Sequence, residues 1–141
     1  MPEPIIYKTN HFGKEFKIIN KKHIERLLQT EVAIKNYPFL VKIISSHEPL
    51  LEASAVQWLL IVSKKRFKLA VHRNRIRRRM REGIRLHQQD LCNHLRLADR
   101  AYYIALQYVG SFDASSLWIQ DKMQQTLSLI LQQAAREMGR E

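Results

Sequence analysis

The strongest constraint on this chain is a crowded run of arginines, "LAVHRNRIRRRMREGIR", at residues 69–85. Seven of these 17 residues are arginine, in a segment that otherwise has the pattern of a helix. Like charges one helical turn apart destabilise a helix by roughly 0.2–0.5 kcal/mol per pair. A helix here therefore needs an anchored apolar face, and something outside the chain should neutralise the arginines.

Positive charge is concentrated in this part of the chain. The formal net charge is +11, from 24 Lys+Arg against 13 Asp+Glu. Residues 63–85 hold eleven of the basic side chains and one acidic side chain, Glu82. The rest of the chain is nearly neutral, with 13 basic and 12 acidic residues. An anionic polymer or an anionic surface is the natural partner of such a strip.

Length and composition suit one globular domain, residues 1–141, with 45% hydrophobic and 26% charged residues. A lone cysteine, Cys92, excludes an internal disulfide, and no N-terminal segment has the apolar run of a signal peptide. The longest apolar run, residues 58–62, is far shorter than the roughly 20 residues of a membrane span. We therefore expect a cytoplasmic protein with no membrane partner, and nothing implies a protein partner.

The first half of the chain predicts one helix and two strands. Asn20 is a candidate N-cap for a short amphipathic helix of about three turns. Its apolar face consists of Ile24, Leu27 and Leu28. Residues 38–46 and 56–63 are rich in β-branched and aromatic side chains and are predicted to form an antiparallel pair of strands.

The second half adds a strand and a long helix. Residues 101–108 are a third strand candidate, and Asp113, Ser115 or Ser116 can cap the helix that follows. The apolar face of this last helix comprises Ile119, Met123, Leu127, Ile130, Ala134 and Met138. With the arginine-rich helix between the second and third strands, the predicted order is α-β-β-α-β-α, an α+β fold.

Residues from about 71 to 97 are predicted to form the arginine-rich helix, because its apolar side chains fall on one narrow stripe. The stripe consists of Ile76, Met80, Ile84, His87 and Leu91. One flank of the stripe carries Asn74, Arg77, Arg78, Arg81 and Arg85. Arg75 and Arg79 lie on the other flank, and Arg73 lies almost on the stripe itself.

Nucleic-acid binding is the favoured interpretation of this helix. Runs of charge often form solvated helix faces, but this run is almost one-signed and rich in arginine, whose planar fork pairs with phosphate and stacks on bases. Basic amphipathic helices on membranes pair their basic face with bulky Trp, Phe and Leu residues. The modest stripe of this helix suits packing on a sheet better than insertion into lipid.

Residues 62–85, "VSKKRFKLAVHRNRIRRRMREGIR", resemble the signature of the bacterial ribonuclease P protein component. In that family a strand ends in Ser/Ala-Lys-Lys, and a short loop leads to Ala-(Val/His)-x-Arg-Asn-Arg at the start of a helix. The matching residues are Ser63-Lys64-Lys65, Ala70-Val71, Arg73-Asn74-Arg75, Arg77-Arg78 and Arg81-Glu82. The likeness covers about residues 12–138 and leaves residues 1–11 as an N-terminal extension.

The resemblance implies an α/β sandwich similar to a ribosomal protein domain, with the arginine-rich helix in a left-handed βαβ crossover. It also implies that the chain is the protein subunit of a ribonucleoprotein endoribonuclease. In this enzyme a catalytic RNA subunit removes the 5′ leader of precursor tRNA with Mg²⁺, which the RNA subunit mainly binds. The implied partners are therefore the ribonuclease P RNA and precursor tRNA.

The implied RNA-binding residues lie where the second strand meets the arginine-rich helix. They are Lys64, Lys65, Arg66, Lys68, Arg73, Asn74, Arg75, Arg77, Arg78, Arg81 and Arg85. A neighbouring cleft for the leader is assigned to Lys17, Ile24, Leu28 and Phe67, with Phe67 expected to be exposed. Lys17 replaces the family's arginine, and Ile24 and Leu28 stand where family members often have aromatic residues.

We predict no catalytic or metal-binding residue in the protein itself. A two-metal mechanism needs several convergent carboxylates, and the aspartates at positions 90, 99, 113 and 121 are scattered along the chain. Glu82 is expected to pair with Arg78 or Arg85. The alternative function is a general RNA- or DNA-binding module, such as a ribosomal or nucleoid protein, with no role in cleavage.

Overall fold

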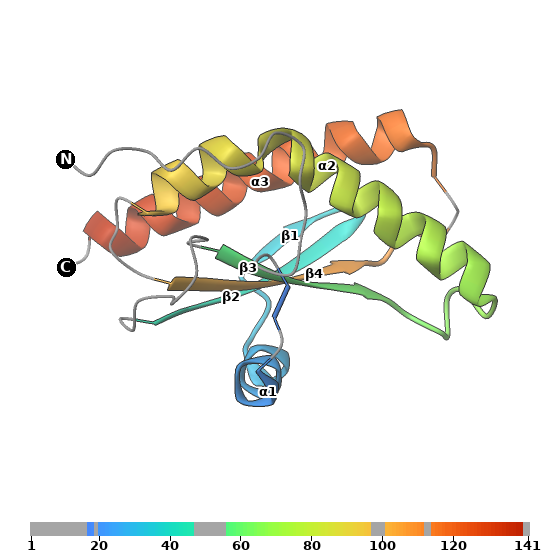
Figure 1. Ribbon diagram of the computed structural model, residues 1–141, viewed down its shortest axis with the longest axis horizontal. Helices are drawn as coiled ribbons and strands as arrows, with labels where there is room; N and C mark the ends of the chain where they lie inside the picture. Colours follow the sequence, from blue (N-terminus) through green and yellow to red (C-terminus); the bar gives the residue numbers. More distant parts are fainter. Residues whose placement is uncertain (1–16, 19, 47–55, 97–100, 112–113, 140–141) are drawn as a thin grey trace.

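The computed structural model describes residues 17–18, 20–46, 56–96, 101–111 and 114–139. Its elements, in chain order, are α1 (Lys21–Gln29), β1 (Ile34–Asn36), β2 (Phe39–Ser46), β3 (Val56–Val62), α2 (Ala70–Arg96), β4 (Ala101–Tyr108) and α3 (Ser116–Gly139). Figure 1 shows three layers, with α2 and α3 on one face of the sheet and α1 on the other. The α+β class and the predicted order are confirmed, with the short strand β1 as an addition.

The sheet order is β1-β2-β4-β3. The predicted antiparallel pairing of residues 38–46 with residues 56–63, which form β2 and β3, is therefore wrong. β4 lies between them, antiparallel to β2 and parallel to β3. β2 and β3 thus run in opposite directions and are not paired with each other, because β4 pairs with β2 over residues 101–108 and with β3 over residues 102–108. α2 joins the parallel neighbours β3 and β4, which confirms the βαβ crossover, while its handedness stays a prediction.

Strand residues alternate between two apolar clusters, as a period of two requires. Trp58, Tyr102 and Tyr108 face α2 and α3 and belong to the larger cluster. Tyr103 and Ala105 face α1 and belong to a smaller cluster with Leu27. Helices therefore cover both faces of the sheet at least in part.

An N-cap residue precedes each of α1 and α3. The side chain of Asn20 accepts a hydrogen bond from the backbone N–H of Lys22 at 2.9 Å, which satisfies a donor that the first turn of a helix leaves free. The hydroxyl of Ser115 accepts one from the backbone N–H of Trp118 at 3.3 Å. Asn20 and, among the three candidates for α3, Ser115 are thereby confirmed as caps, and Asp113 lies outside the described residues.

The apolar stripes predicted for α2 and α3 are the faces that pack. On α2, Ile76, Met80, Ile84 and Leu91 are buried, and His87 lies at the boundary, half-buried. On α3 the buried residues of the predicted stripe are Ile119, Met123, Leu127, Ile130 and Ala134, and the side chain of Met138 lies outside the described part. Within that part, no helix has the length and apolar character needed to cross a membrane.

Candidate nucleic-acid interface

A short loop connects β3 to α2, and its backbone is held by its own hydrogen bonds. The N–H of Phe67 donates to the carbonyl of Ser63 at 3.1 Å, and the N–H of Lys65 donates to the Ser63 hydroxyl at 3.1 Å. Phe67 is buried against Tyr108, with ring centroids 6.1 Å apart. The expectation of an exposed Phe67 is therefore wrong, because the aromatic ring fills the core beneath a loop whose neighbouring side chains face water.

The four basic side chains of this loop, which we call the basic loop, are exposed: Lys64, Lys65, Arg66 and Lys68. Arg66 donates through Nη1 to the carbonyl of Val109, just after β4, at 2.9 Å. This bond ties the loop to the end of the central strand while leaving most of the guanidinium donors of Arg66 available. The buried Phe67 and the bonded Arg66 therefore hold the lysines outward.

Arg73 has a structural role at the start of α2. Its Nη1 donates to the carbonyls of Phe67 at 2.8 Å and Lys68 at 2.9 Å. The side chain thus reaches back to the basic loop, where both carbonyls lie between the end of β3 and the start of α2. Arg73 thus fixes the loop relative to the helix, in addition to any contact that it makes with RNA.

Other arginines of α2 are also partly engaged within the protein. Arg77 donates to the side-chain oxygen of Asn74 at 2.8 Å. Arg85 pairs with Glu82, which confirms one of the two predicted pairings of that carboxylate. Arg79 donates to the carbonyl of Ala114 and so connects α2 to the segment before α3. The one acidic residue of this region is consequently already neutralised.

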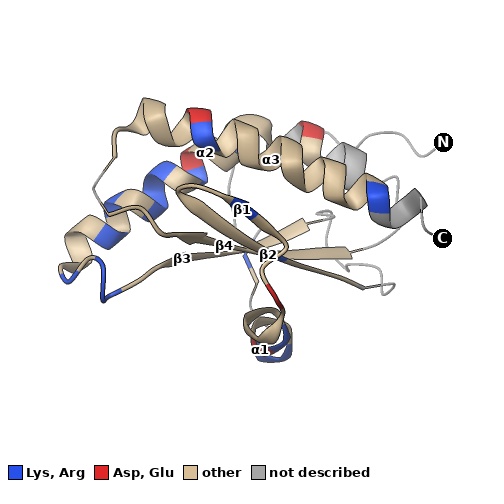
Figure 2. Cartoon of the chain, turned by 180° about the vertical axis from the view of Figure 1, so that it is seen from behind, with Lys and Arg blue, Asp and Glu red and all other residues tan. Residues whose placement is uncertain are grey.

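A set of cations remains without a side-chain partner among the described residues. It consists of Lys17, Lys64, Lys65, Lys68, Arg78 and Arg81. Figure 2 shows Lys and Arg positions gathered on the first half of α2 and on the basic loop, with a smaller group on α1 and scattered positions on the other elements. Because each unpaired cation repels its neighbours, this face favours an anionic partner.

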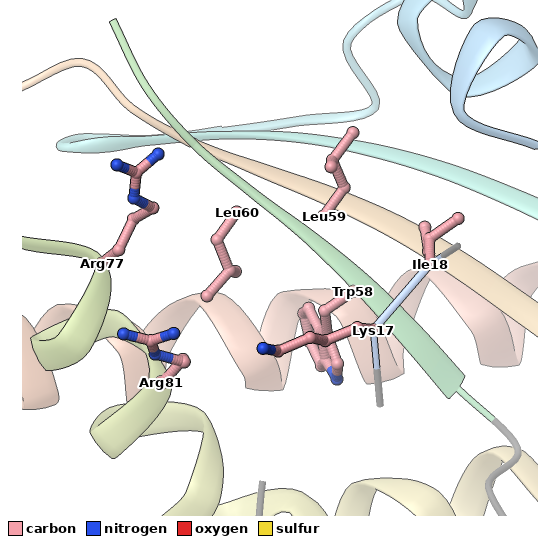
Figure 3. Close-up of a pocket in the computed structure, with 7 residues that line it drawn as sticks. All are labelled: Lys17, Ile18, Trp58, Leu59, Leu60, Arg77 and Arg81. Atoms are coloured by element: carbon pink, nitrogen blue, oxygen red, sulfur yellow. The ribbon is translucent and has the colours of Figure 1, made fainter. Parts of the chain in front are cut away.

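Two hollows border this face, and Arg81 lines both. One, of about 200 Å³, lies at the outer edge of β3 and is lined by Lys17, Ile18, Trp58, Leu59, Leu60, Arg77 and Arg81. In Figure 3 the Lys17 side chain extends toward Arg81, with Leu60 between β3 and α2. The other, of about 420 Å³, is lined by Val71, Asn74, Arg75, Arg78 and Arg81. Cations thus surround recesses large enough to receive phosphate groups.

The family model described as Ribonuclease P matches residues 12–130, which is most of the chain. The chain belongs to the ribonuclease P protein family. Membership makes it a subunit of an endoribonuclease that processes tRNA and implies an RNA partner. No curated protein sequence matches this ribonuclease P protein.

The fold is similar to that of solved structures of ribonuclease P proteins. The ribonuclease P protein of Staphylococcus aureus is 21% identical, with a TM-score of 0.60, over 82% of this chain and 94% of that one. A mutant of the S. aureus protein, described as having defective mRNA degradation activity, is 24% identical, with a TM-score of 0.62, over 83% of this chain and 89% of that one. These matches support the same α+β arrangement in this ribonuclease P protein.

The four residues predicted for a leader cleft do not come together in this ribonuclease P protein. Phe67 lies in the larger core, and Lys17 lies at the edge of β3. Ile24 packs in the smaller cluster under α1, and Leu28 is 48% exposed. Phe67 and Ile24 thus pack in clusters on opposite faces of the sheet, and Lys17 and Leu28 line different hollows.

Leu28 instead lines a narrow groove between α1 and the sheet. The groove is lined by Leu28, Leu40, Lys42, Ile61, Ala105 and Gln107. Lys42 donates to the carbonyl of Leu28 at 2.7 Å, so it also holds the end of α1 on the sheet. The strand residues of this groove were not predicted from the sequence. The alternation of residues along each strand predicts that these side chains share one face of the sheet. The position of α1 on that face then decides which part of it stays open as a groove.

The described residues contain no cluster of three or more His, Cys, Asp or Glu side chains able to hold a metal ion. The lack of a protein-borne metal site stays a prediction, as do the roles of the individual RNA-binding residues.

Proposed function

We propose that this chain is the accessory protein subunit of ribonuclease P and binds the catalytic RNA through the first half of α2 and the basic loop. The observation that carries the proposal is the set of cations on this face without a partner in the described protein, among them Arg78 and Arg81. Such cations bind phosphates without reading base edges. The partner is therefore a folded RNA recognised by its backbone, as the family implies.

The proposed role in catalysis is electrostatic. Two polyanions, the catalytic RNA and the precursor tRNA, must approach each other, and free Mg²⁺ otherwise screens their repulsion. Cations of the protein add contacts to either RNA and so lower the concentration of Mg²⁺ that cleavage needs. The RNA subunit holds the Mg²⁺ that takes part in the reaction and performs the 5′ cleavage of precursor tRNA.

We place the 5′ leader along the groove between α1 and the sheet. Its lining combines apolar Leu28 and Ile61 with the polar groups of Lys42 and Gln107. A lining of this kind suits an extended single strand, whose bases contact apolar side chains and whose phosphates meet a cation. The recess itself is small, about 20 Å³, so we place the leader along its rim and not inside it.

The test is cleavage of precursor tRNA by a bacterial ribonuclease P RNA over a range of Mg²⁺ concentrations. Adding the chain should give 5′-leader removal at Mg²⁺ concentrations where the RNA alone is slow. The double variant Arg78→Ala/Arg81→Ala should need more Mg²⁺, and high Mg²⁺ should restore much of the rate, because the lost contacts are electrostatic. Arg136→Ala, which removes an exposed arginine from the last turn of α3, is the matched control and should behave as the parent protein.

Three results would contradict parts of the proposal. RNA-free protein that cleaves precursor tRNA at a specific site would place the chemistry in the protein. An unchanged Mg²⁺ requirement in the double variant would remove Arg78 and Arg81 from the interface. A chain that binds RNA but never stimulates cleavage would instead be a general RNA-binding module.

A further inference from the structure

An aromatic pair, one ring exposed and the other partly buried, lies at one end of the sheet, outside the arginine-bearing face of α2 and the groove under α1. Tyr37, in the turn between β1 and β2, is 54% exposed. Trp118, in the first turn of α3, meets it edge-on, with ring centroids 6.2 Å apart and planes at 69°. The indole of Trp118 thus contacts one side of the Tyr37 ring, and much of the remaining Tyr37 side chain is exposed to solvent.

Cations flank this pair along α3 and along the sheet. Lys122, one turn further along α3, places its Nζ 5.9 Å from the centroid of the Trp118 ring. Next to Tyr37, the carbonyl of Pro38 accepts from the N–H of Val109 at 2.7 Å, and the carbonyl of Val109 accepts from Arg66 at 2.9 Å. Two hydrogen bonds therefore link the turn that holds Tyr37 to the basic loop.

The two strand ends and the basic loop meet at the same edge of the fold. Phe39 and Val62 are both paired with Tyr108, at the end of β4. Figure 1 shows the β1–β2 turn, the start of α3 and the β3–α2 loop toward the same side of the molecule. Tyr37 consequently lies beside the basic loop but outside the set of side chains on the face of α2.

The surroundings favour an unpaired nucleotide as the occupant of this surface. The large buried rings beneath the turn, Phe39 and Tyr108, already complete the core, so core packing does not require the exposed face of Tyr37. Exposed aromatic faces flanked by cations stack on bases of single-stranded nucleic acid, irrespective of sequence. A protein partner would need a broader contiguous apolar patch. Among the described residues, the other exposed apolar side chains on this side are Leu117 on α3 and, past the basic loop, Leu69 and Val71 at the start of α2.

We propose that Tyr37, supported by Trp118, stacks on one unpaired base of an RNA, and that the basic loop holds an adjacent phosphate of the same strand. This is a contact distinct from the phosphate contacts of α2 and from the groove under α1. It rests on the proposed function only in requiring that the chain binds RNA.

The experiment compares short oligouridines that are complete with a series in which one nucleotide at a time lacks its base. With the parent chain, removing the base at the stacked position should raise the dissociation constant about fivefold or more, as loss of one aromatic stacking contact does. In Tyr37→Leu, which keeps an apolar side chain, the complete strand should bind as weakly as that abasic strand, and removing the base should have little further effect. Tyr37→Phe keeps the ring and should match the parent.

Leu86→Ala, which truncates an exposed side chain far along α2, controls for the loss of exposed apolar surface and should bind both strands as the parent does. Circular dichroism melts of every variant establish that the fold is kept. Equal losses for complete and abasic strands in Tyr37→Leu would overturn the stacking contact, as would a parent chain indifferent to every missing base. In those cases the proposed function stands, since phosphate binding and stimulation of cleavage are measured separately. A parent chain that binds no oligouridine and stimulates no cleavage would overturn both.

Discussion

At the scale of single residues, arginines that look alike in the sequence differ in what they contact. Arg73 donates to the carbonyls of Phe67 and Lys68, whereas Arg78 is exposed and has no partner among the described residues. The same side chain therefore fixes a loop at one position and remains available to a ligand at another. Substitution by alanine should separate the two roles.

Arg73→Ala should lower the free energy of unfolding by about 1–3 kcal/mol, because hydrogen bonds from a charged donor to carbonyls are lost. Arg78→Ala, the same change five residues further along the helix, should leave stability unchanged or slightly higher, since repulsion between like charges is relieved. Urea unfolding followed by circular dichroism measures both values. Equal unfolding midpoints for Arg73→Ala and the parent would show that the loop does not depend on this guanidinium.

At the scale of elements, the pairing of α2 with α3 depends on a close approach at Gly83. A Cβ atom at this position would lie 2.9 Å from Cγ and 3.0 Å from Cβ of Met123 on α3. Glycine in a helix costs about 1 kcal/mol relative to alanine, so its presence here trades helix stability for a short distance between the helices. The contact is part of the larger core, because Met123 is fully buried.

Gly83→Val should therefore destabilise the protein by about 1–3 kcal/mol, the usual effect of overpacking. Met123→Ala alone should also be destabilising, by about 2–5 kcal/mol, because it leaves a cavity. The double variant should lose less than the two single losses added together, since the new methyl groups occupy the space that Met123 vacates. Thermal or urea unfolding of the four proteins completes the cycle, and strictly additive losses would argue against the contact.

At the scale of the whole molecule, a net charge of +11 is carried largely by one side of the fold. The affinity for RNA should fall steeply with salt, with log K decreasing by roughly 0.7–0.9 per phosphate contact for each tenfold increase in salt. Arg78→Ala and Arg81→Ala should each reduce this slope by about one contact or less. The exposed arginine of α3 again provides the control, because Arg136→Ala removes the same charge from the far end of the molecule.

Fluorescence anisotropy of a labelled RNA at several salt concentrations measures the slopes. A parent slope near zero would mean that the positive face does not carry binding. Equal reductions by Arg136→Ala and Arg81→Ala would mean that the total charge matters and that its location does not.

The sequence alone predicted the three helices, three of the four strands and the residues of the basic face. Helical periodicity identified the buried side of α2, from Ile76 to Leu91, and the run of arginines identified its exposed side. These are local properties, because each depends on residues within a few turns of one another. The same locality explains the caps at Asn20 and Ser115, and the pairing of Glu82 with Arg85.

Contacts between distant residues were decided only by the tertiary structure. Strand order is one example, since β4 pairs with both β2 and β3 and no local pattern in either strand reveals that neighbour. Phe67 is another, because a loop residue is buried or exposed according to whether a core cavity lies beneath it, here beside Tyr108. The residues predicted for a leader cleft also lie apart, because their positions depend on how distant elements pack on the sheet. The sequence determined which face of each element is apolar or charged, whereas the sheet that these elements share decided which faces meet, because burying an apolar face requires a partner that is distant in the chain.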